Sequence, residues 1–155
     1  MKNIHLIPTD KYSDLVHSTN KYGGYFLSRH YSPMKDMGDS YQNIYITNDE
    51  EIKDGDWTFD GENPYKWTED DVKDCLYNPG SENYKGCKKI ILTTDGDLIK
   101  DGIQAIDDTF LEWFVKNPSC KRVEVSEDYF KPSNMVYGID MYPYKIIIPS
   151  INSLI

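Results

Sequence analysis

Aspartates beside glycine are the residues of this 155-residue chain that most resemble a chemical site. The tetrapeptide IKDG occurs at residues 52–55 and again at 99–102, and each copy has a further Asp-Gly or Gly-Asp step nearby. Carboxylates so arranged can hold a divalent cation or transfer protons. A calcium loop that began at Asp95, however, would have Ile99 in place of an oxygen ligand and Ile106 in place of the bidentate glutamate. We therefore interpret both copies as turns, in which glycine supplies a positive φ, and expect no metal site.

The histidines and cysteines do not form a recognisable site either. The histidines lack a second ligand at the spacing of a metal site, and the cysteines follow no C-x-x-C pattern. No nucleophile elbow, phosphate-binding loop or dinucleotide-binding glycine pattern is present. We therefore expect no enzymatic activity, no cofactor and reduced thiols. The residues concerned are His5, His17, His30, Cys75, Cys87 and Cys120.

Two segments combine cations with hydroxyl or aromatic groups and are candidate binding surfaces. PTDKYS, at residues 8–13, offers two hydroxyls and a lysine, which suit a phosphate. YFLSRHYSP, at residues 25–33, places an arginine among aromatic rings, which suits a nucleobase or a phosphate. The alternative for both is ordinary turn and loop packing. The predicted ligand-binding residues are Thr9, Lys11, Ser13, Tyr25, Arg29, His30, Tyr31 and Trp67.

Acidic residues dominate one quarter of the chain. The net charge is −9, and residues 41–80 contain eleven acidic and three basic side chains. This charge repels phosphate backbones and so disfavours binding to bulk nucleic acid. A basic protein surface, or a small anion in a local basic pocket, is the expected partner. No apolar run reaches the length of a membrane span, and the N-terminus lacks a signal-peptide core. The acidic residues most informative for protein docking are Asp54, Asp56, Glu69, Asp70 and Asp71.

The elements that must position these residues are mostly strands. Short β-branched or aromatic runs bounded by turn residues predict them. The unbroken apolar centre of 88–94 predicts a buried strand, whereas the alternation of 122–126 predicts one wet face. The predicted strands are 3–7, 23–28, 43–47, 56–59, 88–94, 122–126 and 144–149.

One amphipathic helix is predicted over 107–117. Either Asp107 or Asp108 can cap it, and an Asn-Pro step ends it. A second, short helix is predicted over 68–77, capped by Thr68. The apolar stripe of the main helix consists of Phe110, Leu111, Trp113, Phe114 and Val115.

These elements predict a single α+β domain over residues 1–155. We expect a compact, curved, mainly antiparallel or mixed β-sheet, or a small barrel, with the main helix packed on it. Residues 17–42 and 60–87 are predicted surface excursions. Long excursions from a compact scaffold are where binding residues tend to lie.

Four blocks of the chain resemble a family of small uncharacterised proteins encoded by tailed bacteriophages. The blocks are IHLIPTDKYS, YITNDEEIKDGDW, KKIILTTDGDLIKDGIQAIDDTFLEWFVKNPSC and YKIIIP. The resemblance spans most of the chain except residues near 17–40 and 60–86, which vary within the family. It implies a viral origin and the cytoplasm of an infected bacterium, and it brings no catalytic residues with it.

Variable loops on a fixed scaffold favour recognition over catalysis. Our leading hypothesis is a homo-oligomeric phage accessory protein that sequesters a nucleotide-type immune signal, such as a cyclic nucleotide, without cleaving it. The alternative is an acidic interaction module that docks on a host protein and inhibits it by mimicking nucleic-acid charge.

Overall fold

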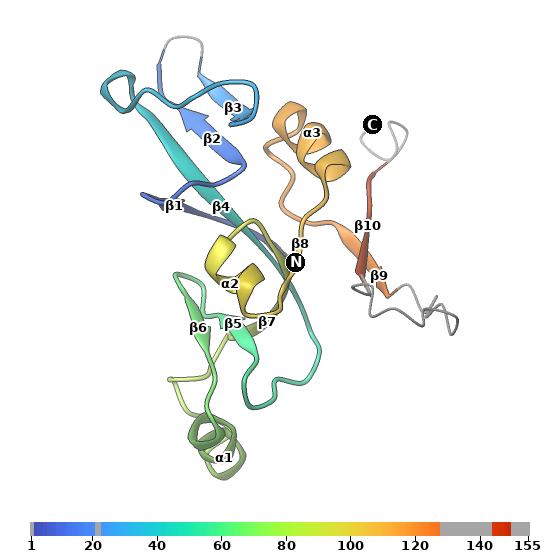
Figure 1. Ribbon diagram of the computed structural model, residues 1–155. Helices are drawn as coiled ribbons and strands as arrows, with labels where there is room; N and C mark the ends of the chain where they lie inside the picture. The colour runs from blue at the N-terminus through green and yellow to red at the C-terminus, as the bar shows by residue number, and fades with distance from the viewer. Residues whose placement is uncertain (1, 21–22, 128–143, 150–155) are drawn as a thin grey trace.

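The protein, described as a computed structural model over residues 2–20, 23–127 and 144–149, is built from short strands and three α-helices (Figure 1). The strands are β1 (Ile4–Thr9), β2 (Leu15–Ser18), β3 (Gly24–Leu27), β4 (Asp39–Asn48), β5 (Trp57–Phe59), β6 (Pro64–Lys66), β7 (Lys88–Thr93), β8 (Gln104–Ala105), β9 (Glu124–Glu127) and β10 (Tyr144–Ile147). The helices are α1 (Glu69–Tyr77), α2 (Gly96–Lys100) and α3 (Asp108–Lys116), and a 3-10 turn, η1, covers Lys35–Met37.

The ten-residue strand β4 organises the main sheet. Strand β1 pairs with one edge of β4, and β2 and β7 both pair with the other edge, β2 nearer the start of β4 and β7 nearer its end. Two residues show this: Gln42 pairs with both β1 and β2, and Tyr45 pairs with both β1 and β7. The path of the sheet is β3-β2-β4-β7-β5-β6, and it is open at both ends. All pairs are antiparallel except β7 with β8, and β9 with β10 forms a separate two-stranded sheet. The fold is therefore an open sheet and not a barrel.

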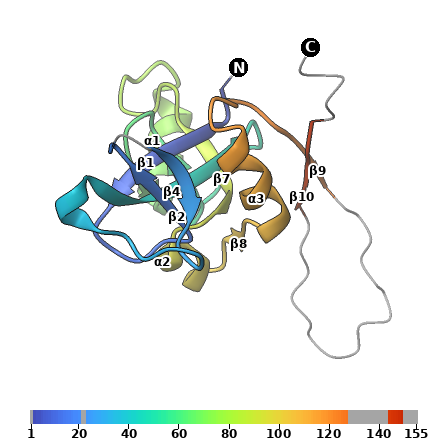
Figure 2. The same cartoon turned by 90° about the horizontal axis from the view of Figure 1, so that it is seen from above.

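Both faces of the sheet are covered. Ile44 and Ile46 of β4 belong to a large apolar cluster that includes α3, whereas Tyr45 belongs to a second cluster with Leu98 of α2. Figure 2 shows α3 between the main sheet and the β9–β10 pair, and Ile146 of β10 joins the large cluster. The α3 side chains that are fully buried are Phe110, Leu111 and Phe114.

The structure confirms the predicted α+β class and both predicted helices. Asp107 caps α3 through its carboxylate, which accepts the Phe110 N–H at 2.7 Å. Thr68 caps α1 in a capping box with Asp71. The glycines of both IKDG copies have positive φ, +87° at Gly55 and +103° at Gly102, as the turn interpretation requires.

Several elements differ from the sequence prediction. Strands β2, β6 and β8 and helix α2 were not predicted, and β4 begins at Asp39, well before the predicted residue 43. Asp95 and Gly96 do not form a simple turn, because Asp95 caps α2 by accepting the Asp97 N–H at 3.0 Å. The predicted excursion 17–42 therefore contains β3 and the ends of β2 and β4. No helix in the described ranges is long and apolar enough to cross a membrane.

Candidate functional site

The hydroxyls and the lysine of residues 8–13 are engaged within the protein. Ser13 is buried, and its hydroxyl donates to the Gln42 carbonyl at 2.6 Å. The Thr9 hydroxyl accepts the Lys11 backbone N–H at 3.1 Å. The Lys11 ammonium lies 2.5 Å from an Asp97 carboxylate oxygen, which raises the pKa of Lys11 through hydrogen bonding and charge. This segment is thus a hydrogen-bonded turn whose one cation already faces an acid.

Arg29, the other predicted anion-binding cation, is held by two carboxylates of α3. Its guanidinium lies 2.9 Å from Asp108 and 2.6 Å from Glu112. A hollow of about 230 Å³ beside it is lined by Asp14, Leu27, Arg29, Asp108 and Leu111, so acids outnumber cations there. Exposed ion pairs of this kind contribute only about 0–1 kcal/mol. An anion could therefore displace an acid, but the surrounding field opposes it.

The predicted aromatic residues do not share one surface. Tyr25 is half-buried against His17 and Phe114, with ring centroids 4.6 and 5.8 Å apart respectively. His30 accepts a 3.4 Å hydrogen bond from Arg29, and Tyr31 packs edge-on against Phe26. The two predicted segments adjoin, because the Ser28 hydroxyl donates to that of Tyr12 at 3.0 Å. Trp67 follows β6, and Figure 1 places that connection far from β2 and β3.

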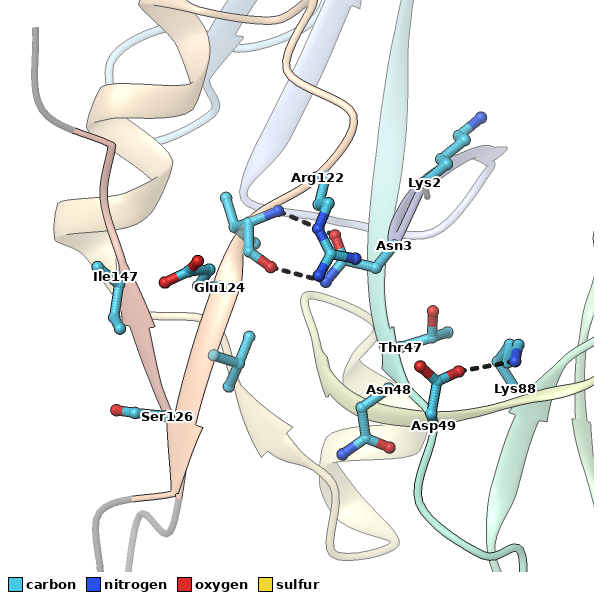
Figure 3. Close-up of a pocket in the computed structure, with 12 residues that line it drawn as sticks. Lys2, Asn3, Thr47, Asn48, Asp49, Lys88, Arg122, Glu124, Ser126 and Ile147 are labelled. Carbon is cyan, nitrogen blue, oxygen red and sulfur yellow. Dashed lines mark hydrogen bonds and ion pairs between the residues drawn. The ribbon is translucent and has the colours of Figure 1, made fainter. Parts of the chain in front are cut away.

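A larger hollow lies between the main sheet and β9, at residues that the sequence prediction did not select (Figure 3). It measures about 510 Å³, and its cations are Lys2, Lys88 and Arg122. The Asn3 side chain fixes one wall by donating to the Val123 carbonyl and accepting the Val123 N–H, at 2.8 and 2.9 Å. Lys2 lies just before β1, Lys88 begins β7 and Arg122 lies just before β9, so the fold brings together cations from three distant segments of the chain.

The hollow of Figure 3 has a mixed charge. Lys88 lies 2.7 Å from Asp49, and the pKa of Asp49 is lowered first by this hydrogen bond and charge and also by Arg122. Glu124 is a second acid in the lining. Three cations and two acids leave a net of +1, which is unusual in a chain of net −9. The hollow therefore suits an anion better than the hollow beside Arg29 does.

Helix α1 lies within a segment that we call the acidic excursion, residues 60–87. This segment has seven acidic and three basic side chains, a net of −4. Figure 1 shows α1 beyond β5 and β6, away from the rest of the sheet. No residue of α1 is buried, and its last two side chains, Leu76 and Tyr77, are 76% and 83% exposed.

Tyrosine hydroxyls, more than apolar packing, hold α1 in place. Tyr84 donates to Asp71 at 3.2 Å and to Asp74 at 2.9 Å, and Tyr65 donates to Asp71 at 3.1 Å. A nine-residue helix without a buried face is marginal by itself, so these bonds and the capping box must supply its order. Acids in the first turn also favour the helix dipole, which accounts for part of the charge.

A cavity of about 310 Å³ opens between β6 and α1. Trp67 forms one wall, is only 5% exposed, and meets Tyr84 edge-on at 5.1 Å. The indole N–H of Trp67 is buried without an acceptor among the described residues. Leaving such a donor unpaired costs about 1–3 kcal/mol. The cavity is lined by Asp60, Tyr65, Trp67, Asp71, Asn83, Tyr84 and Cys87.

The potential in this cavity is negative. Backbone N–H groups lower the pKa of Asp60 and of Asp71, so both stay ionised near neutral pH. Burial raises the pKa of the Cys87 thiol, and the charges of Asp60 and Asp71 raise it further. The pKa of Tyr84 is also raised, first by desolvation and then by its hydrogen bonds to Asp74 and Asp71. Aromatic walls and ionised acids together suit a cation.

The described residues contain no cluster of metal-ligating side chains and no disulfide. Within residues 2–20, 23–127 and 144–149, no three His, Cys, Asp or Glu side chains are grouped to hold a metal ion. The three cysteines form no disulfide.

Comparison of the chain with protein-family models, with curated proteins and with solved structures gave no match.

Proposed function

We propose that the protein is a non-enzymatic interaction module that docks its acidic excursion on a basic surface of another protein. The observation that carries this proposal is α1, an unburied helix with acids in its first turn and exposed Leu76 and Tyr77 at its end. Long-range attraction between acidic and basic surfaces accelerates encounter, and exposed aromatic and aliphatic side chains supply the contact area that slows dissociation.

The state of the predicted anion-binding cations also favours docking. Lys11 and Arg29 each face carboxylates, so the segments around them present balanced charge. The acidic excursion has no such balance. If the chain is phage-encoded, as its sequence resemblance implies, the partner would be a protein of the infected bacterium.

Affinity capture from a bacterial extract tests the proposal when matched charge variants are compared. We expect Glu69→Gln with Asp70→Asn to lose a partner that the wild type retains. Asp10→Asn with Asp36→Asn removes the same charge from exposed positions elsewhere and should retain it. Circular dichroism must show α1 intact in the first variant. Equal loss in both variants would mean that only net charge matters, and equal retention would reject the docking surface.

The hollow of Figure 3 supports a second candidate, the sequestration of a nucleotide-type anion. Its volume, about 510 Å³, lies within the roughly 300–1,000 Å³ range of small-molecule sites. If an anion binds there, Asp49 competes with it for Lys88. Asp49→Asn should then tighten binding of a cyclic dinucleotide by up to about tenfold in calorimetry, or ~1.4 kcal/mol. Asp97→Asn, which releases Lys11, is the matched control and should change nothing; equal affinities for both variants would reject this site.

A further inference from the structure

The cavity between β6 and α1 has walls of two kinds. Trp67, Tyr65 and Tyr84 supply aromatic surface, while Asp60 and Asp71 supply charge. Aromatic faces attract cations through their quadrupoles, and carboxylates accept hydrogen bonds from them. A neutral or anionic guest would leave the negative charges of the two acids without a counter-cation. The lining therefore selects a cation.

The carboxylates retain acceptor capacity for a guest. Asp60 uses Oδ1 to accept the N–H groups of Glu62 and Asn63, at 2.7 and 2.8 Å. No other described residue donates to Asp60 Oδ2, and Asp71 Oδ1 accepts one bond among these residues, from Tyr84. Each carboxylate oxygen can accept about two bonds. Two oxygens can thus receive donors without disturbing the capping box of α1.

Arginine fits this lining better than lysine does. Its guanidinium is flat, stacks on aromatic rings, carries several fixed donors and is weakly hydrated, whereas the ammonium of lysine is a strongly hydrated point charge. The cavity volume, about 310 Å³, lies at the small end of the range for ligand sites, which suits one side chain. The Trp67 side chain, whose buried indole N–H has no acceptor among the described residues, belongs to the same lining and can report on a bound guest.

We propose that this cavity is an anchor site for one arginine side chain of the partner protein. The inference rests on the proposed docking function, and it names the residue that the partner inserts. Leu76 and Tyr77, which are exposed at the end of α1, then add contacts outside the pocket. Desolvated anchors of this type, with arginine strongly represented, dominate many protein interfaces.

Blocked arginine tests the pocket without the partner. Acetyl-arginine amide is titrated into the 155-residue chain while the Trp67 indole N–H is followed by NMR. We expect a saturable shift of this signal, and at least tenfold weaker binding of acetyl-citrulline amide, which has nearly the same shape without the charge. Asp60→Asn should weaken arginine binding several-fold. Asp101→Asn is the matched control and should not, because Asp101 is a carboxylate beside a different indole, that of Trp57, whose N–H donates to it at 2.7 Å.

The outcomes separate the pocket from the docking surface. No shift of the Trp67 signal, or equal binding of citrulline, would overturn the anchor site even if α1 variants abolish docking. A saturable shift that Asp60→Asn weakens and Asp101→Asn does not would establish the site even if those α1 variants leave docking unchanged. If Asp60→Asn fails to fold, the contrast between arginine and citrulline in the wild type still decides the question.

Discussion

Replacing Phe114 with alanine should destabilise the protein severely, because this ring joins α3 to the sheet. Phe114 is fully buried and lies near two other rings, Phe110 at 5.9 Å and Tyr25 at 5.8 Å between centroids. Truncating a buried phenylalanine removes its transfer free energy and leaves a cavity, which together cost about 3–5 kcal/mol. That is a large part of the total stability of a domain, about 5–15 kcal/mol.

Thermal unfolding gives the magnitude directly. For a chain of this size each kcal/mol corresponds to roughly 2–4 °C in Tm, so Phe114→Ala should lower Tm by about 6–20 °C. Leu76→Ala, a truncation on an exposed helical position, should stay within about 0.5 kcal/mol of wild type. A Tm for Phe114→Ala that matches the Leu76→Ala value would refute the packing of α3 on the sheet.

Three further predictions concern caps, alkaline stability and metal. Asp107→Ala removes the cap of α3 and should cost about 0.5–2 kcal/mol in denaturant unfolding, whereas Asp107→Asn should cost less. Burial and a hydrogen bond to Asp95 raise the pKa of Tyr45 above its ordinary value of 10.0, so the folded state keeps a proton that the unfolded state loses. The contribution of this proton to the free energy of unfolding should accordingly be fully present below pH 10 and decrease above it. Tyr45→Phe should make the loss of stability with rising pH less steep, and an unchanged slope would contradict the assignment. Calorimetry should detect no calcium binding at low micromolar concentration, because Asp95 accepts a hydrogen bond from Tyr45 and Asp97 accepts one from Lys11. Calcium binding that Asp95→Asn abolished would show a metal site there.

Elements with a strong local pattern were predictable from the sequence. The apolar run of 88–94 became β7, whose adjacent residues Ile90 and Ile91 pack into different clusters, as expected of a strand that is buried on both sides. The helical spacing of Phe110 and Phe114 likewise located α3. In both cases the pattern within the segment itself predicts the element, because the apolar residues that follow its period are also the buried ones.

The short elements were not predicted because each has too few residues to show a strand or helix period. Strand β2 has two adjacent buried residues, Leu15 and Val16, and owes its conformation to pairing with β3 and β4. Helix α2 has five residues, and its Asp-Gly start is also typical of a turn. Strand β4 begins at Asp39, whose buried carboxylate accepts the Met34 N–H at 3.0 Å, a bond that no strand propensity indicates.

The sequence could not show that acidic side chains pair with the cations of the predicted binding segments. Lys11 meets Asp97 and Arg29 meets Glu112 across separations of 86 and 83 residues. Only the folded topology shows that these cations face acids. By contrast, the excess of acid in residues 41–80 is local, and it pointed to the region that contains α1.

Amide hydrogen exchange with the captured partner tests the docking proposal most directly. Helix α1 has no buried residue, so its amides should exchange rapidly in the free protein. We predict that the partner protects amides within residues 60–87 and leaves residues 8–33 unchanged. Protection confined to residues 8–33, or to the strands around the hollow of Figure 3, would contradict docking through the acidic excursion.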